Sequence, residues 1–347
     1  MLGGNIIKHI LFFLIFVVLV AVVFFGIEWF SHSVGDIFAH KLVSSLSKSS
    51  LADSVPNVSA STQKQQLAVS PPQNSLQKPM RILEVPDLTS GAVAATSVDV
   101  NAGQPITLFG QNENKKLPIA SLTKLMTALV VLQYYDLNHQ VIIDQGAMSQ
   151  EGEQGDLKLG QVLSVKNLLY IALMESSNRA AYQLSEVAGV NSFVGLMNQD
   201  AQNLGLTNTH FLDSTGLDDN SYSTVQDLVT LTRYLFDNYL LFRQITGVKN
   251  YDLYMPDGTF HHTPVSTDNL LGTDGIISGK TGYTYGANGC FMVVSLLPTS
   301  QGPLAVLPSG QDELQKGNYI ISVVLGANDR SLEMKKILDW DSLAYHW

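Results

Sequence analysis

The first hydrophobic pattern along this chain is an uninterrupted apolar run close to its start. Residues 10–27 read ILFFLIFVVLVAVVFFGI and carry no charge. About 18–20 such residues can cross a bilayer as a helix. The run is long for a signal-peptide core and no clear cleavage site follows it, so we favour an uncleaved anchor over a cleaved signal. Lys8 precedes the run, and Glu28 and Asp36 follow it. The positive-inside rule therefore predicts a cytoplasmic tip and single-pass anchor over 1–31, with the rest of the chain outside the cell membrane.

The second pattern is the absence of any apolar period from residue 32 to residue 80. The stretch SVPNVSASTQKQQLAVSPPQNS is typical of it, being rich in Ser, Gln, Ala and Pro. Such a segment cannot bury enough apolar surface to offset the entropy lost on ordering. We therefore expect a flexible tether, with a mean span of about 35 Å for roughly 40 residues.

The third pattern, over residues 81–347, mixes strand and helix periods. Two strand-like runs surround an Asn-Ala-Gly turn in GAVAATSVDVNAGQPITLFGQN. Two more strand-like runs, CFMVVSLL and NYIISVVLGA, come late. Strands at both ends with helices between them indicate one α+β layered domain. Apolar residues at i, i+3 and i+4 predict the helices over 121–135, 165–188, 191–204 and 224–241, and a final helix follows over 331–340.

Composition narrows the class of protein. The net charge of −10 speaks against a nucleic-acid partner, because binding phosphates needs a basic face. Cys290 is the single cysteine, so no intramolecular disulfide can form. It lies in the apolar run GCFMVVSLL, which favours a buried strand thiol over a nucleophile.

Candidate chemistry begins with the pattern S-x-x-K. Ser and Lys three residues apart on a helix share a face, and a lysine with a lowered pKa can accept the serine proton. Only Ser121 and Lys124 stand on a predicted helix with an apolar face, ASLTKLMTALVVL. The alternative for Ser121 is an N-cap, the commonest role of a serine where a helix starts. The other three matches fall in the predicted tether, at Ser45/Lys48, Ser61/Lys64 and Ser75/Lys78.

Two further patterns follow in order. Ser176 and Asn178 form an S-x-N within LLYIALMESSNRAAYQL, which alone could be a polar helix end or loop tip. Lys280 begins a K-T-G triplet in GIISGKTGYT, which alone could be a solvated turn. Together, S-x-x-K, S-x-N and K-T-G are the signature set of penicillin-binding proteins and class A β-lactamases.

The chain resembles the serine-type D-Ala-D-Ala carboxypeptidases, the low-molecular-mass penicillin-binding proteins, from about Ala92 onward. Four segments carry the resemblance: LPIASLTKLMTAL, LKLGQVLSVKNLLYIALMESSNRAAYQLSE, LGLTNTHFLDSTGLDDNSYSTVQDLVTLTRYL and DGIISGKTGYTYGANGC. The resemblance implies a three-layer α/β/α domain of the β-lactamase and DD-peptidase type, with an antiparallel sheet and a helical cluster. It implies no metal and no cofactor.

The resemblance also implies a role for each motif residue. Ser121 would be the acylated nucleophile, Lys124 its general base, and Ser176 a proton relay. Three catalytic residues of this kind need no Asp or His. The backbone N–H groups of Ser121 and Tyr283 would form the oxyanion hole. The substrate-binding residues would be Asn178, which holds the peptide backbone, Lys280 and Thr281, which bind the terminal carboxylate, and their neighbours Gly282 and Tyr283.

The activity so implied is removal of the terminal D-alanine from peptidoglycan stem peptides, with β-lactams as covalent inhibitors. The alternatives are D,D-endopeptidase action on cross-links and a catalytically impaired wall-binding homologue. Arg179 motivates the latter, because the family usually reads S-G-N-D-A where this chain reads SSNRA, a local change of two charges. A β-lactamase is disfavoured. In class A β-lactamases a Glu helps to activate the deacylating water, but the loop candidates here, Glu151 and Glu153, precede the S-x-N motif rather than follow it.

Overall fold

In the computed structural model, residues 78–100, 104–297 and 319–347 are described. The predicted membrane anchor and nearly all of the predicted tether lie outside these residues, as does the Asn-Ala-Gly turn at 101–103. Within the described ranges, no helix is both long enough and apolar enough to cross a membrane. All of these residues belong to one unit, 73–347.

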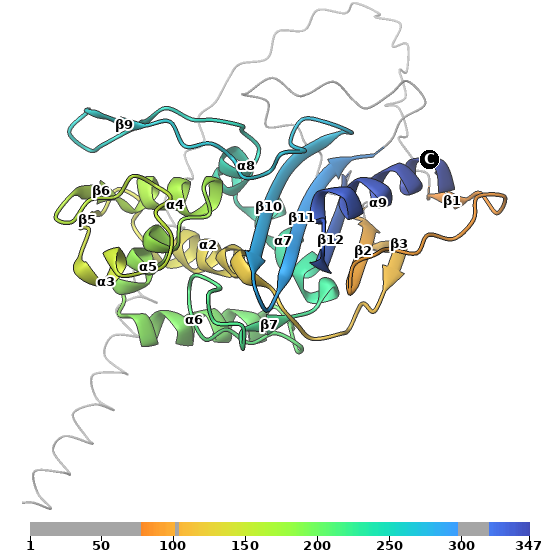
Figure 1. The fold of residues 1–347 in the computed structure, drawn as a ribbon, viewed down its shortest axis with the longest axis horizontal. Helices are drawn as coiled ribbons and strands as arrows, with labels where there is room; N and C mark the ends of the chain where they lie inside the picture. The colour runs from red at the N-terminus through yellow and green to blue at the C-terminus, as the bar shows by residue number, and fades with distance from the viewer. Residues whose placement is uncertain (1–77, 101–103, 298–318) are drawn as a thin grey trace, which may run out of the picture. The chain divides into compact units, whose positions relative to one another are not determined.

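Five antiparallel strands form the central sheet, in the order β10-β11-β12-β2-β3 (Figure 1). Two of the three inner strands, β11 and β12, are buried along nearly their whole length. A strand covered on both faces has to be apolar throughout, which is why these two were recognisable as the runs CFMVVSLL and NYIISVVLGA. The strand bounds are β2 Ala94–Asp99, β3 Ile106–Gln111, β10 Ile276–Thr284, β11 Asn288–Leu296 and β12 Tyr319–Ala327.

Helices cover both faces of this sheet. Val324 of β12 packs in one core with Met334 and Ile337 of α9 (Arg330–Ala344). Its neighbour Val323 points the other way, into the larger core shared with the helical cluster. Successive strand residues face opposite sides, so one strand contributes to both cores. The α+β class, with an antiparallel sheet between α9 and a helical cluster, agrees with the sequence prediction.

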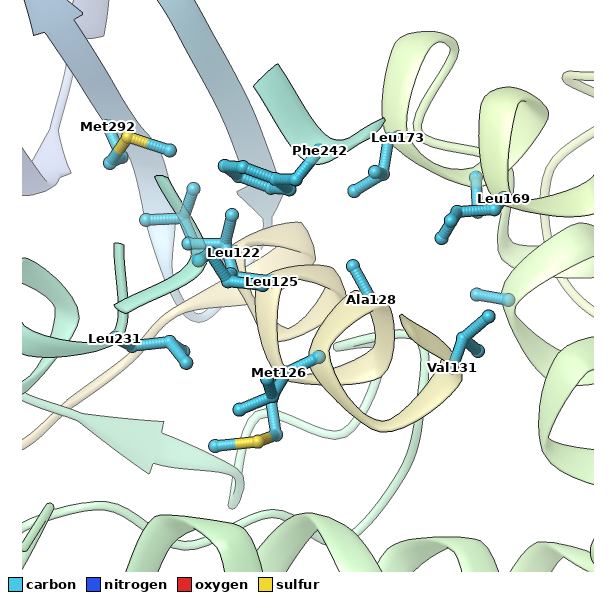
Figure 2. Packing of buried hydrophobic residues seen from close by; sticks show 14 of the residues in the cluster. Leu122, Leu125, Met126, Ala128, Val131, Leu169, Leu173, Leu231, Phe242 and Met292 are labelled. Carbon is cyan, nitrogen blue, oxygen red and sulfur yellow. The ribbon is translucent and has the colours of Figure 1, made fainter. Parts of the chain in front are cut away.

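Helix α2 (Thr123–Tyr134) is the centre of the helical cluster. Every residue from Thr123 to Val131 is buried. Helices α4, α5, α6 and α7 pack around it. A helix buried on all sides must be apolar nearly all round, so a polar residue on α2 needs a specific partner. Figure 2 shows Leu122, Leu125, Met126, Ala128 and Val131 of this region among Leu169 and Leu173 of α4, Leu231 of α7, Phe242 of α8 and Met292 of β11.

The remaining elements are shorter. The 3-10 turn η1 (Ala120–Leu122) leads directly into α2. Four small antiparallel pairs, β1–β13, β4–β7, β5–β6 and β8–β9, border the main body. Their bounds are Met80–Arg81 with Tyr345–His346, Leu117–Pro118 with Tyr222–Ser223, Gln140–Ile142 with Val162–Ser164, and Leu253–Tyr254 with Phe260–His262. The other helices are α3 Gln145–Met148, α4 Val165–Met174, α5 Asn178–Glu186, α6 Val190–Asn203, α7 Val225–Asn238 and α8 Leu240–Thr246.

Two predicted helices were too long. The helix expected over 165–188 is broken after Met174 and resumes at Asn178. Ser176, in the break, has φ +62°, which no right-handed helix allows. The helix expected over 224–241 likewise breaks at Tyr239, whose backbone is extended. Periodicity missed both breaks because the apolar spacing continues across them.

Asp341 of α9 is a carboxyl group buried against the sheet. It accepts a hydrogen bond from Ser97 of β2, which also receives one from Ser322 of β12 at 3.2 Å. Its Oδ1 has no hydrogen-bond partner among the described residues. Burial raises the pKa of Asp341 from 3.8 to about 7, with the Ser97 bond opposing the shift. The protein therefore loses stability as the pH rises from about 4 to about 7, and this loss is complete above that value.

We predict that Asp341→Asn stabilises the protein at pH 8 and hardly changes it at pH 4. Between pH 4 and 7 the folded state binds more protons than the unfolded state, so the wild type loses stability as pH rises. Asn keeps an acceptor for Ser97 without the charge, and we expect a gain of roughly 1–3 kcal/mol at pH 8. Urea unfolding at both pH values measures this. An equal effect at the two values would contradict it.

Candidate functional site

Ser121 lies at the junction between η1 and α2, partly exposed on an otherwise buried segment. It does not cap the helix: the N-cap of α2 is Leu122, and no side chain accepts a hydrogen bond there. Ser121 Oγ instead lies 2.9 Å from Nζ of Lys124. The preceding residue, Ala120, has φ +48°, an uncommon conformation for a residue with a β-carbon. Such backbone departures gather at functional sites.

Lys124 brings an amine into the buried helix α2, and this amine needs hydrogen-bond partners. Only 1% of its surface is exposed. Besides Ser121, Nζ contacts Oδ1 of Asn178 at 2.7 Å and the Thr215 carbonyl oxygen at 2.6 Å. Burial lowers the pKa of Lys124 to about 7, and the charge of Asp213 opposes the shift. Burial, rather than the neighbouring charge of Lys280 or Arg179, is thus the main reason why this amine can be neutral.

The loop that holds the Thr215 carbonyl is built around Asp213. Its carboxylate accepts hydrogen bonds from the backbone N–H groups of Thr215 at 2.5 Å, Gly216, and Asp218 at 2.7 Å. Gly216 has φ +81°, and a β-carbon there would lie 1.9 Å from the Ala120 carbonyl oxygen. Only glycine can occupy this position, because both the conformation and the close approach exclude a side chain.

The S-x-N motif lies in the break between α4 and α5. Ser176 Oγ accepts a hydrogen bond from Nζ of Lys280 at 2.8 Å. Ser177 caps α5 and also donates to the Gln154 carbonyl oxygen at 2.6 Å. The Asn178 amide group is used on both sides, by Lys124 at its oxygen and by the Glu151 carbonyl at its nitrogen, 2.9 Å away. The break in the helix therefore places both motif residues against lysines of the other two motifs.

The K-T-G motif lies in β10, an edge strand of the sheet, rather than in a turn (Figure 1). Lys280 and Thr281 are buried, while Tyr283 is 61% exposed. Burial, followed by the charges of Lys124 and Arg330, lowers the pKa of Lys280 well below its ordinary range. A β-carbon on Gly282 would lie 3.0 Å from the Ser121 nitrogen, so the glycine allows β10 to approach the turn before α2.

The structure thus brings all three predicted motifs together at the junction between sheet and helical cluster. Sequence reasoning missed Arg330, whose Nη1 donates to the Gly282 carbonyl oxygen at 3.1 Å. It also missed Asp213 and the loop that fixes Lys124. Arg330 follows the K-T-G triplet by 50 positions, (330 − 280), and no local pattern points from one to the other.

Two alternative chemistries find no support among the described residues. Cys290 is fully buried, and burial raises the pKa of its thiol to about 12, so it stays protonated. The described ranges also hold no group of three or more His, Cys, Asp or Glu side chains that could bind a metal ion. What the site offers is a serine hydroxyl next to a lysine that can be neutral, beside a second buried lysine and the edge of a sheet.

Comparisons with known proteins agree with the family resemblance that the three motifs indicate. Residues 81–301 match the model of a family described as D-alanyl-D-alanine carboxypeptidase. A D-alanyl-D-alanine endopeptidase from Escherichia coli (strain K12) is 31% identical over 228 residues, 64% of this chain and 72% of that protein. The carboxypeptidase DacF of Bacillus subtilis (strain 168) is 30% identical over 271 residues, 73% of this chain and 63% of that protein. The Streptomyces K15 DD-transpeptidase structure is similar with a TM-score of 0.63 and 27% identity, covering 74% of this chain and 99% of that one.

We predict that Gly216→Ala destabilises the protein by about 2 kcal/mol or more, because a β-carbon collides with the Ala120 carbonyl and strains the backbone. Gly195→Ala is the matched control. Gly195 lies inside α6, and a β-carbon added there would meet no heavy atom within 4 Å, so alanine should stabilise by up to about 1 kcal/mol. Urea unfolding of both variants measures the difference. A Gly216 variant as stable as the wild type would contradict the close approach.

Proposed function

The chain belongs to the D-alanyl-D-alanine carboxypeptidase family of hydrolases, and from this premise we propose that it removes the terminal D-alanine of peptidoglycan stem peptides through an acyl-enzyme on Ser121. The observation that carries the proposal is the 2.9 Å contact between Ser121 Oγ and a buried lysine whose pKa is lowered to about 7. A neutral amine at this distance can take the hydroxyl proton as the oxygen attacks.

The hydrogen-bond count on Lys124 supports this direction of proton transfer. A neutral amine has two N–H donors and one lone pair. Asn178 Oδ1 and the Thr215 carbonyl are acceptors only, so they take the two N–H groups. In this neutral form the lone pair is left for the Ser121 hydroxyl, which would then donate across the 2.9 Å contact. The two acceptors orient the base toward the nucleophile.

The reaction would proceed in two halves. Ser121 Oγ attacks the carbonyl carbon of the penultimate residue while its proton moves to Lys124. The C–N bond then breaks, and the proton taken up by Lys124 passes through Ser176, which Lys280 holds by the 2.8 Å hydrogen bond, to the leaving D-alanine nitrogen, so that Lys124 becomes neutral again. Water later attacks the ester carbonyl while Lys124 takes up its proton, and Lys124 returns that proton to Ser121 Oγ as the ester C–O bond breaks. The backbone N–H groups of Ser121 and Tyr283 would stabilise the oxyanion, and Gly282 allows their elements to come close.

Different parts of the site would bind the terminal carboxylate of the substrate and the rest of the peptide. A terminal carboxylate near Lys280 and Thr281 would raise the pKa of the Lys280 amine again, because an opposite charge favours the charged form. Arg330 adds a permanent positive charge beside the same strand. The rest of the peptide would extend along β10, since an edge strand of a sheet can pair with an extended chain.

D,D-endopeptidase action is the second candidate function. Three of the relatives, from E. coli (31% identical), Pseudomonas aeruginosa (35% identical) and Haemophilus influenzae (38% identical), are D-alanyl-D-alanine endopeptidases. A nucleophile, base and oxyanion hole serve both reactions equally. The size of the leaving group, one D-alanine or a cross-linked peptide, separates the two.

We also propose that the domain acts outside the cell membrane, anchored by the apolar run at 10–27 and spaced from the bilayer by the tether. A substrate in the cell wall and inhibition by β-lactams are both consistent with a domain on the outer side of the membrane. The proposal of an impaired, wall-binding homologue is less favoured, because burial rather than Arg179 dominates the pKa of Lys124.

We predict that the full chain releases D-alanine from a linear pentapeptide and forms a covalent adduct with a labelled penicillin, and that Ser121→Ala loses both. Intact-mass measurement detects the adduct, and peptide mapping places it. A parallel assay on a cross-linked dimer distinguishes carboxypeptidase from endopeptidase action. A folded wild-type protein without an adduct, under conditions that label a related enzyme, would overturn the proposed function.

We predict that the acylation rate rises with pH through about 7 and then levels off. Lys124 must be neutral to accept the Ser121 proton, and its pKa is lowered to about 7, so the reactive fraction grows as pH passes this value. Single-turnover acylation by a penicillin between pH 5 and 9 measures it, with the protein's fold checked at each pH. A rate that is unchanged down to pH 5 would exclude Lys124 as the base.

A further inference from the structure

The position of Ser176 depends on its neighbours. Its φ of +62° is uncommon for a residue with a β-carbon. Such a conformation persists only where the surroundings fix it. Ser176 belongs to the three-residue link between α4 and α5, in which Glu175 precedes it and Ser177 follows it. The contacts of Glu175 and Ser177 therefore decide where the Ser176 hydroxyl lies relative to Lys280.

Two separate segments contact this link. On one side, the loop before β6 accepts hydrogen bonds from Ser177 at Gln154 and from Asn178 at Glu151. On the other side lies the hairpin β8–β9 with the residues that follow it. Thr267 donates its backbone N–H to the Met174 carbonyl at 3.0 Å, where α4 ends. The link is thus held between a loop and a hairpin.

The hairpin's side-chain contact is made by His262 to Glu175. His262 Nε2 and Glu175 Oε2 are 2.8 Å apart, and the two side chains are only 18% and 19% exposed. Glu175 is adjacent to Ser176 in the chain, so an ion pair or hydrogen bond that fixes Glu175 also limits the rotation of the Ser176 backbone. Low exposure makes this contact stronger than a pair in open solvent.

The neighbouring His261 contacts the other ring nitrogen of His262. The Nδ1 atoms of the two rings form a hydrogen bond, and His261 Nε2 is buried with no partner among the described residues. Burial, then His262 and Lys158, lower the pKa of His261, while Asp156 raises it. A neutral His261 can donate from Nδ1, which leaves His262 to accept at Nδ1 and donate from Nε2 to Glu175. The pair thus presents a donor to the carboxylate.

We propose that His262, acting through Glu175, is a positioning residue for Ser176 in the reaction. The inference rests on the proposed function, since it assigns Ser176 a part in proton transfer. Among the described residues, the side-chain partners of His262 are Glu175 and His261. Its role is therefore to hold the link in the conformation in which the Ser176 hydroxyl contacts Lys280. A displacement of about 1 Å at a reacting group can lower a rate by up to roughly a hundredfold.

The test uses four variants of the full chain: His262→Ala, Glu175→Ala, the double variant of both, and His262→Gln. We expect each alanine variant to lower kcat for D-alanine release, and the first-order rate of penicillin acylation, by about tenfold with KM changed by less than about threefold. The double variant should lose no more than either single one, because both remove the same contact. His262→Gln should recover much of the rate, since its amide can still donate to Glu175.

His139→Ala is the matched control, because His139 is an exposed histidine just before β5 and should leave both rates unchanged. Unfolding midpoints of all variants separate loss of fold from loss of rate. Unchanged rates in a folded His262→Ala protein, additive losses in the double variant, or no recovery in His262→Gln would each overturn the positioning role alone. A wild-type chain that neither releases D-alanine nor forms an adduct would overturn the proposed function and this inference with it.

Discussion

The burial of two lysine amines at one place is the constraint on which the site depends. Lys124 and Lys280 are each 1% exposed, and removing an amine from water is costly unless its donors are satisfied or its charge is given up. The fold does both. It supplies oxygen acceptors from Asn178, the Thr215 carbonyl and Ser176, and it lowers the pKa of both amines. The burial that makes these two amines need hydrogen-bond acceptors is therefore also the cause of their lowered pKa values, on which the reactivity of Lys124 depends.

Supplying these acceptors requires unusual backbone around the site. Ala120 and Ser176 adopt positive φ angles, and Gly216 and Gly282 allow contacts that no side chain would fit. These residues come from segments far apart in the chain, and each contacts a neighbour from another motif. A change at any of them is therefore felt by the others, which is the behaviour of a network rather than of independent contacts. The hydrophobic core around α2 keeps the whole arrangement in place (Figure 2).

Sequence reasoning recovered what repeats along the chain and missed what depends on contacts between distant segments. Buried strands such as β12 and the apolar helix α2 carry their own signal in the spacing of hydrophobic residues. The three motifs could be found because their order matched a known family. The break at Ser176 could not, because α4 and α5 share one apolar period. The placement of Lys280 in a strand could not be predicted from the K-T-G triplet either, because its glycines also fit a turn. Arg330 and His262 had no local pattern at all, since their importance comes from Gly282 and Glu175 on other elements.

The location of β10 at one edge of the sheet has a consequence for how copies of the protein meet at high concentration. Under the proposed function, β10 has to keep its outer edge accessible to an extended peptide, so this edge strand cannot be fully covered by a helix or blocked by a proline or a row of charges. Tyr283 and Tyr285 are exposed near its end, at 61% and 98%, and add apolar surface there. An accessible edge strand can also pair with a strand of another copy, so association between copies would compete with the proposed peptide binding for β10.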